Sequence, residues 1–339
     1  MIPRPVKQLI LHNLIRLGLR RPSIILAASQ VTAAGLNKFM LDDAAHDIFY
    51  KHGFHLLRKH YYLPIPDETD LHDRLWEERS ELVGLEMNDS GAVHLLSDVF
   101  PPYVDEFRNL FPTHQEAHSP AGFYLINGSF MAVDAHVYYA FIRHFKPQRV
   151  IEIGSGFSTL LAAAAGIQNL KEKSEAPHLT VIDPFPSASL KEEVPGLSQV
   201  IETRVQDVSL DLFTSLQAGD ILFIDSTHAL KAGSDVQFEY CEILPRLQPG
   251  VLVHIHDISL PKHYPRVYFE KNRLYWNEQY VLQTFLAFNS RFEVLWPGNY
   301  MMLKYPEDVC AVFPEYHTMR EHFPQSEPSS FWMRVKLRD

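Results

Sequence analysis

The stretch RVIEIGSGFST, residues 149–159, decides the fold of this chain. A short apolar run, Val150–Ile153, ends in the loop Gly154–Gly156, and a helical pattern then begins. Glycines at such a strand-to-helix turn let the backbone approach a ligand without an intervening side chain. Dinucleotide-binding loops need Gly or Ala at the third glycine position, which here is Thr159. Glu152 also disfavours a pyrophosphate, so the loop favours a ligand that carries positive charge.

Downstream of this loop, short apolar runs alternate with helical segments. The runs predicted to be strands are Val150–Ile153, Leu179–Ile182, Val200–Val205, Ile221–Ile224 and Val251–Ile255. Continuous apolar runs are typical of strands buried on both faces, and their alternation with helices predicts a doubly wound α/β sheet. Two more strands, Phe292–Trp296 and Ser330–Leu337, bring the sheet to about seven strands, the last of them antiparallel. Ligands bind at the carboxyl ends of strands in such sheets.

The chain is predicted to have two regions. Residues 147–339 carry the sheet, and residues 1–146 are expected to be mainly helical, serving as a cap, part of an acceptor pocket or a dimerisation surface. Within them a helix is predicted over Asp134–Phe145, ended by Lys146-Pro147. The first 41 residues contain no Asp or Glu and hold the basic residues Arg4, Lys7, Arg16, Arg20, Arg21 and Lys38. This pattern favours an amphipathic helix that packs on the domain or across a dimer, with a membrane-surface helix or a transit peptide as alternatives.

The composition is that of a globular protein, with 46% hydrophobic residues and a net charge of -10 over 339 residues. Net acidity disfavours a general nucleic-acid binder, because neutralising phosphates needs a basic face. Only Cys241 and Cys310 are present, which fits a reducing compartment and predicts a cytoplasmic location. No apolar run reaches the ~20 residues of a membrane span. We therefore expect a small-molecule partner, no nucleic acid and no transmembrane span, and leave homo-oligomer formation open.

The glycine loop, Asp183 at the end of the second run and Gln206-Asp207 after the third make residues 149–296 resemble a class I S-adenosylmethionine-dependent methyltransferase. The resemblance implies a Rossmann-like fold with S-adenosylmethionine as cofactor, its ribose hydroxyls on Asp183 and its adenine near Asp207. The residues that would bind this cofactor are Glu152, Gly154, Gly156, Ser158, Asp183 and Asp207. In the alternative, the glycines serve only a turn. The polar stretch 168–177 is predicted to be an extended loop.

Two strand ends carry a second set of candidates. Asp225 and His228 follow the fourth run, and His254, His256 and Asp257 end the fifth. Neighbouring parallel strands would bring these ends together, and His254 and His256 share one face of their strand. The pattern is similar to that of metal-dependent O-methyltransferases of the catechol type and of the cephalosporin-tailoring branch. These enzymes place an acid after the fourth strand and an acid followed by Asn or Asp after the fifth.

This resemblance implies one divalent ion held by Asp225, His256 and Asp257, and His228, three positions after Asp225, is the natural extra ligand, so three or four ligands are expected. His256 stands where the family has a carboxylate, so iron, manganese or zinc fits better than magnesium. His228 is either a ligand or a metal-free general base, and both remain open. His254, deeper in the strand, is expected to be a core histidine.

The sequence thus predicts an enzyme that transfers a methyl group from S-adenosylmethionine to a small-molecule hydroxyl, with metal assistance left open. His228 and His256 are the catalytic candidates. One alternative is a non-heme iron oxygenase or hydroxylase that uses two histidines and a carboxylate on the same scaffold. The other alternative is a non-catalytic binding module.

Overall fold

The computed structural model describes residues 22–39, 43–55, 57–115, 122–172 and 176–337. The chain divides into two compact units, residues 1–71 and His72–Asp339. The first contains α2 (Pro22–Phe39) and α3 (Asp43–Lys51). Most of the basic N-terminal segment, residues 1–21, lies outside the described residues, so its predicted packing stays a prediction. Among the helices of the described residues, none is long and apolar enough to cross a membrane.

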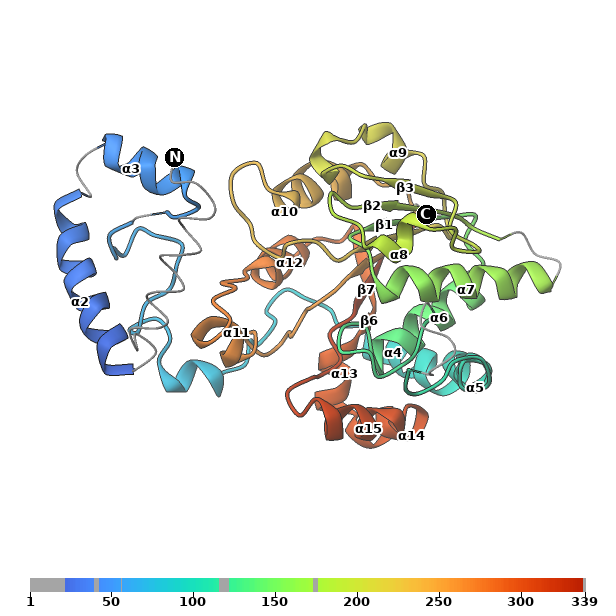
Figure 1. The fold of residues 1–339 in the computed structure, drawn as a ribbon. Coiled ribbons are helices and arrows are strands. Elements are labelled where there is room, and N and C mark those ends of the chain that lie inside the picture. Colours follow the sequence, from blue (N-terminus) through green and yellow to red (C-terminus); the bar gives the residue numbers. More distant parts are fainter. Residues whose placement is uncertain (1–21, 40–42, 56, 116–121, 173–175, 338–339) are drawn as a thin grey trace. The chain divides into compact units, whose positions relative to one another are not determined.

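A seven-stranded sheet runs through the second unit (Figure 1). Its strands are β1 (Arg149–Ile153), β2 (His178–Ile182), β3 (Gln199–Ile201), β4 (Ile221–Ile224), β5 (Leu252–Ile255), β6 (Phe292–Pro297) and β7 (Phe331–Val335). The strand order is β3-β2-β1-β4-β5-β7-β6. The first five strands are parallel, whereas β7 is antiparallel to both β5 and β6. The predicted Rossmann-like sheet with an antiparallel last strand is therefore confirmed.

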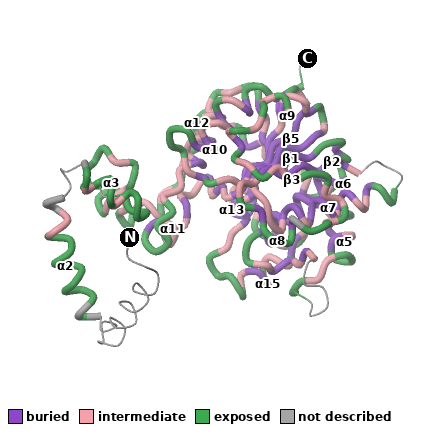
Figure 2. Tube along the Cα trace, turned by 45° about the horizontal axis from the view of Figure 1, so that its top comes forward, coloured by how far each residue is buried: buried purple, intermediate pink, exposed green. Residues whose placement is uncertain are grey.

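The sheet is buried on both faces because successive side chains of its strands enter two different apolar cores. Val150 and Phe223 belong to one core, and Ile151 and Ile224 belong to the other. In Figure 2 the strands accordingly form the buried interior of this unit.

Helices cover the two faces in two groups. The first core includes residues of α4 (Asp89–His94), α5 (Phe100–Leu110), α6 (Asp134–Phe145), α7 (Phe157–Lys171), α13 (Gly298–Lys304), α14 (Pro306–Val312) and α15 (Glu315–His322). The second includes residues of α9 (Leu210–Thr214), α10 (Asp235–Phe238) and α12 (Glu278–Leu286). The short helices α8 (Ala188–Lys191) and α11 (Arg266–Glu270) lie in connections that follow strands. The 3₁₀ turns are η1 (Asp73–Trp76), η3 (Val205–Asp207) and η5 (Leu244–Arg246), and the π-helical turns are η2 (Leu95–Val99) and η4 (Glu239–Ile243).

Two predicted boundaries differ from the structure. Helix α7 continues to Lys171, so the first four residues of the loop predicted over 168–177 are helical. The reason is Asn169, which is buried and donates to the carbonyl of Ile142 at 3.1 Å. The third strand ends at Ile201, and Val205–Asp207 forms a 3₁₀ turn in place of strand.

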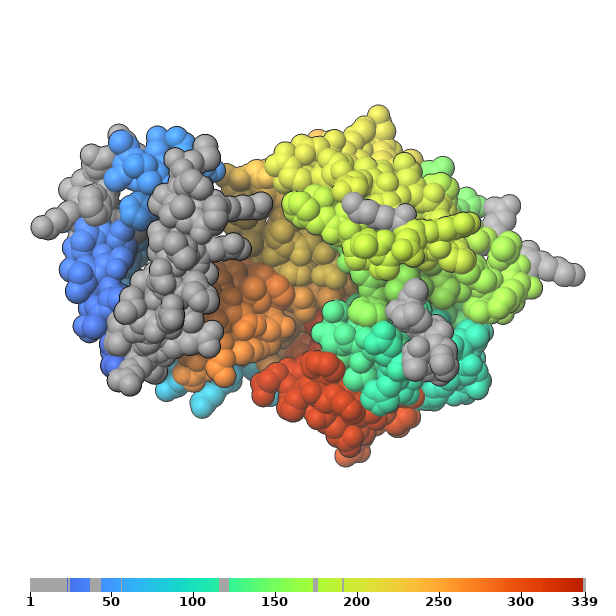
Figure 3. All heavy atoms as spheres, viewed as in Figure 1, coloured from blue at the N-terminus to red at the C-terminus, as the bar shows by residue number. Residues whose placement is uncertain are grey.

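Residues 72–146 belong to the same compact unit as the sheet. Helix α6, predicted from Asp134 to Phe145 and confirmed with those bounds, packs against α7. Helix α5 is tied to α15, because Arg108 donates to Glu315 at 2.6 Å and to the carbonyl of Val312 at 2.8 Å. In Figure 3 the teal part of the chain that includes α5 borders the red part that includes α15. The roles predicted for residues 1–146 stay predictions.

A buried carboxyl, Glu152 of β1, joins three elements of the first core. The hydroxyl of Tyr138 in α6 donates to one of its oxygens at 2.9 Å, and that of Thr159 in α7 donates to the other at 2.5 Å. Glu152 is fully buried, and this burial raises its pKa to about 7 in spite of the two hydrogen bonds.

The raised pKa of Glu152 predicts a pH-dependent stability. A carboxyl of this kind stabilises the fold fully below its ordinary pKa of 4.5, and that contribution is lost as the pH rises through about 7. In the parent protein the unfolding free energy should therefore fall by on the order of 2–3 kcal/mol between pH 4.5 and 8 because of Glu152, and in Glu152→Gln this fall should be absent. Urea unfolding at both pH values measures it, with the exposed Glu81→Gln as control. An unchanged pH dependence in Glu152→Gln would contradict this environment.

The close approach of β1 and β4 predicts that the two loop glycines differ in their tolerance of a side chain. Gly154 has a φ of +90°, and a Cβ there would lie 2.1 Å from the carbonyl oxygen of Asp225. Gly156 has extended backbone and open space where its Cβ would be. Gly154→Ala should lower the unfolding free energy by at least about 2 kcal/mol, and Gly156→Ala by less than about 1 kcal/mol. Equal losses in denaturant titrations would rule out the contact.

Candidate active site

The carboxyl ends of β1, β4 and β5 meet at one edge of the sheet. Ile153 pairs with Ile224, and Ile224 pairs with Ile255. The ladder continues past the strands, because Asp225 donates its N–H to Ile153 and His256 donates its N–H to Ile224, both at 2.9 Å. The glycine loop, Asp225 and His256 therefore follow three neighbouring strand ends.

A cavity of about 1040 Å³ opens at this edge, the upper end of the range for small-molecule sites. The predicted site residues that line it are Gly156, Ser158, Asp225, His256 and Asp257. Its remaining walls include residues 128–132, 262–266 and 324–329. The sequence predictions for the loop and for the strand-end cluster thus meet in one cavity.

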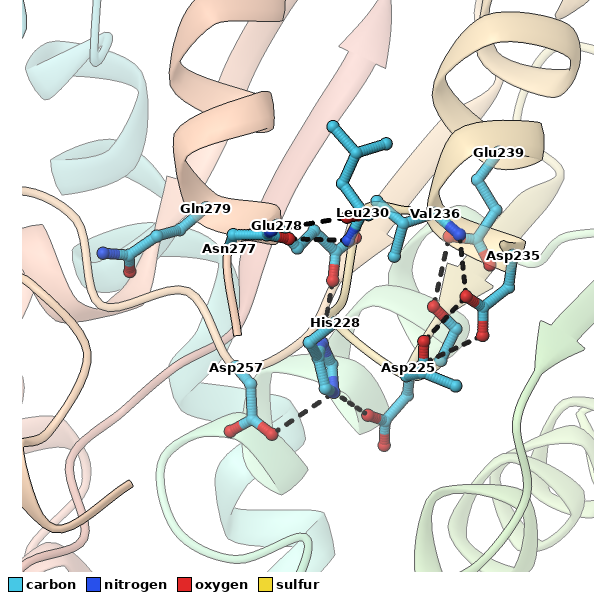
Figure 4. Close-up of polar contacts among 12 residues, drawn as sticks. Asp225, His228, Leu230, Asp235, Val236, Glu239, Asp257, Asn277, Glu278 and Gln279 are labelled. Atoms are coloured by element: carbon cyan, nitrogen blue, oxygen red, sulfur yellow. Dashed lines mark hydrogen bonds and ion pairs between the residues drawn. The ribbon is translucent and has the colours of Figure 1, made fainter. Parts of the chain in front are cut away.

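His228 lies behind two of the cavity's acids (Figure 4). Its Nε2 is 3.3 Å from Asp225 Oδ1 and 3.5 Å from Asp257 Oδ2. Its Nδ1 lies 2.7 Å from Glu278 Oε2. Among the described residues that line the cavity, both aspartates occur and His228 does not. His228 therefore does not face the cavity, and its Nε2 is placed to contact a ligand bound between the two aspartates.

The backbone at this cluster is strained. His228 has a φ of 57° and Asp257 a φ of 55°, both in the left-handed region that few non-glycine residues adopt. Such conformations persist only where surrounding contacts enforce them, and they cluster at functional sites.

The charges of the cluster favour a cation. Burial lowers the pKa of His228, but Asp225 and Glu278 outweigh it and hold that pKa well above its ordinary value of 6.5. Burial likewise opposes charge on His256, yet nearby Asp225 and Asp257 raise its pKa. Burial raises the pKa of Asp225, and the attraction of the two histidines lowers it below its usual value. The carboxylate of Asp225 is thus held ionised, which draws positive charge to the site.

The donor atoms fit a divalent metal ion. One ligand atom each from Asp225, His228 and Asp257 lie within 4.8 Å of one another. Bonds of about 2.1 Å set neighbouring ligands about 3.0–3.4 Å apart in octahedral or tetrahedral sites, close to the separations of 3.3 and 3.5 Å observed. Two carboxylates with one imidazole suit manganese, iron or zinc. His256 lines the cavity beside this trio and is outside it among the described residues.

On the loop side, Asp183 is fixed next to the glycines. The hydroxyl of Ser155 donates to Asp183 Oδ2 at 2.5 Å, and the N–H of Phe185 donates to Oδ1 at 2.7 Å. A carboxylate offers about four acceptor positions, so each oxygen can still take a further donor. Ser155 and Gly156 line the cavity directly.

Asp183 and three other predicted cofactor residues, Glu152, Gly154 and Asp207, are not among the described residues that line the cavity. Glu152 is buried with both oxygens bonded, and Gly154 is needed for the approach to Asp225. Asp207 lies on an exposed turn and bonds Arg204 at 2.8 and 3.1 Å. Their part in binding a cofactor stays a prediction.

Two acids of the site, Asp134 and Glu278, are not among the predicted site residues. Asp134 lines the cavity and accepts from the backbone N–H groups of Ser329 at 2.9 Å and Ser330 at 3.0 Å. Glu278 lies 50 positions from its partner His228. Both stand in the first turn of a helix, where acids are ordinary, so no local pattern marked them.

This chain is similar to other known proteins in sequence and in structure. Residues 151–258 match a family described as a methyltransferase domain. An uncharacterized protein of Archaeoglobus fulgidus is 33% identical over 167 residues, which cover 47% of this chain and 72% of that protein. The crystal structure of an O-methyltransferase from Bacillus cereus in complex with SAH aligns with 73% of this chain and 97% of its own. That alignment has 13% identity and a TM-score of 0.31.

The match to the family lies where the geometry places the site. Its limits, residues 151 and 258, enclose the glycine loop, Asp183 and the cluster at the ends of β4 and β5. The chain belongs to the same family as the Archaeoglobus fulgidus protein, and its residues 151–258 match the model of a methyltransferase domain.

Proposed function

We propose that this protein transfers a methyl group from S-adenosylmethionine to a hydroxyl of a small molecule, with the assistance of a divalent metal ion. One observation carries the proposal: in a methyltransferase domain, the glycine loop and the Asp225–His228–Asp257 cluster come together at a single cavity. Methyl transfer is a displacement at carbon, so orienting donor and acceptor supplies much of its acceleration.

The loop side of the cavity would hold the methyl donor. Gly156 leaves open space beside the loop, and the carboxylate of Asp183 has acceptor positions free for the two ribose hydroxyls. Ser158 lines the same wall. The donor's ammonium and sulfonium groups suit a cavity whose floor is acidic, whereas the phosphates of a dinucleotide would be repelled.

The opposite side would hold the acceptor. Asp225, His228 and Asp257 would hold the metal ion, which lowers the pKa of a bound hydroxyl. Of the two histidines predicted as catalytic, His256 lines the cavity, and it is the candidate to contact the acceptor hydroxyl. His228 has a holding role, because its Nε2 faces the two aspartates.

The donor set disfavours the oxygenase alternative. Non-heme iron oxygenases use two histidines and one carboxylate. The trio found among the described residues has one histidine and two carboxylates.

The donor site predicts binding of S-adenosylhomocysteine. Asp183→Ala removes charge-assisted hydrogen bonds worth about 1.5–3 kcal/mol each, so the affinity should fall at least about tenfold. Calorimetry measures it, with Asp105→Ala as control, since Asp105 is an exposed acid of α5 outside the cavity lining. No binding by the parent, or equal binding by Asp183→Ala, would overturn the donor site.

The metal trio predicts which residues matter for ion affinity. Asp225→Asn and Asp257→Asn each replace a carboxylate by a neutral amide and should weaken Mn²⁺ binding at least about tenfold, by the strong preference of such ions for charged oxygen ligands. His256→Gln, outside the trio, should change it by less than about threefold on the same argument. Calorimetry on the metal-depleted protein separates the cases. If His256→Gln abolishes binding as fully as Asp225→Asn, the ligand set is wrong.

A further inference from the structure

Glu278 is a buried carboxylate whose side chain contacts the ring of His228 and also interacts with the hydroxyl of Tyr240. It stands in the first turn of α12, is fully buried, and its Oε2 lies 2.7 Å from Nδ1 of His228. No hydrogen bond reaches its Oε1 within the part of the chain that the structure describes. Its helix begins at Asn277 without a side-chain cap, so this carboxylate does not serve to start α12. Burying a carboxylate destabilises the fold unless a hydrogen-bond donor or a cation compensates its charge.

The same helix start also holds the backbone of His228. The N–H groups of Asn277 and Glu278 both donate to the carbonyl of His228, at 3.0 and 3.2 Å. The N–H of Leu230 donates to Asn277 Oδ1 at 2.6 Å. These bonds enforce the left-handed conformation of His228, so α12 fixes both the place of this residue and the direction of its ring (Figure 4).

His228 must lose one of its two ring protons to bind a metal ion, and Glu278 on one side and the two aspartates on the other then compete for the proton that remains. Glu278 lies 2.7 Å from Nδ1, whereas Asp225 and Asp257 lie 3.3 and 3.5 Å from Nε2. Hydrogen bonds weaken at the longer distances, so the contact with Glu278 is the stronger one. The proton therefore belongs on Nδ1, and the lone pair of Nε2 points between the two aspartates.

We propose that Glu278 is a positioning residue, which holds the proton of His228 on Nδ1 and thereby aims Nε2 as an acceptor atom into the Asp225–Asp257 pair. The inference rests on the proposed function, because the direction of Nε2 has a consequence only if a metal ion binds at that atom. A carboxylate behind a ligating histidine fixes ring and tautomer, and its loss costs about 10–100-fold in metal affinity.

The experiment compares three variants in full-length protein. Glu278→Leu removes the acceptor, Glu278→Gln keeps a neutral one, and Asn277→Ala loosens the loop without touching the ring. Histidine ¹⁵N NMR of the metal-free protein, titrated to rising pH until His228 carries one ring proton, locates that proton, with His228→Asn identifying the signal. Calorimetry with Mn²⁺ gives the affinity of each variant, and urea unfolding confirms that each is folded.

We expect the parent, Glu278→Gln and Asn277→Ala to carry the proton on Nδ1, with a weaker hydrogen bond and a shifted proton resonance in Glu278→Gln. In Glu278→Leu the proton should move to Nε2, toward the aspartates, and Mn²⁺ affinity should fall at least about tenfold. A proton that stays on Nδ1 in Glu278→Leu, or that leaves it equally in Asn277→Ala, overturns the proposal. If Glu278→Leu does not fold, an unshifted Nδ1 proton in Glu278→Gln overturns it instead.

The NMR result is independent of the methyl donor. Failure to bind S-adenosylhomocysteine would remove the proposed function and leave the ring proton where Glu278 holds it. A proton found on Nε2 in the parent would remove the positioning role and leave the donor site untouched.

Discussion

The approach of β1 to β4 at Gly154 is the constraint on which the site depends. The backbone of Asp225 runs so close to this glycine that no side chain fits between them. Because of that approach, the loop after β1 and the acids after β4 and β5 border the same cavity. A wider spacing would still give a sheet, but it would separate the place for a methyl donor from the place for an acceptor.

The charges at the carboxyl ends of β1, β4 and β5 then determine which ligands the cavity can bind. Asp225, Asp257 and Glu278 surround one imidazole, and Asp134 lies on the same cavity with its carboxylate bonded to the backbone after α15. Acids gathered in a buried place favour a cation or a protonated group. The site is therefore suited to a positively charged methyl donor and to a metal ion, and unsuited to a dinucleotide.

Much of the fold could be predicted from the sequence because its signals are local. The apolar runs and the glycine loop gave the parallel strands, and Lys146-Pro147 gave the end of α6. The third strand was predicted too long, because a buried apolar residue such as Val205 can belong to a turn as well as to a strand. The extra turns of α7 depend on Asn169 reaching Ile142, a tertiary contact that no local pattern contains.

The candidate site could be predicted only in part for the same reason. Residues directly after strands, such as Asp225 and Asp257, are marked by their position. Glu278 and Asp134 act across 50 and 195 positions of sequence, so they become visible only when the chain is folded. Whether a histidine near a strand end lines the cavity, as His256 does, or lies behind the cavity's acids, as His228 does, also depends on the turn that follows the strand.

The most direct test of the account is a crystal structure of the protein grown with S-adenosylhomocysteine and Mn²⁺, with anomalous data at the manganese edge. The account predicts the nucleoside along Ser155–Ser158 with its ribose on Asp183, and one manganese peak between Asp225, His228 and Asp257. A nucleoside bound elsewhere, or a fully occupied manganese away from these three residues, would contradict it.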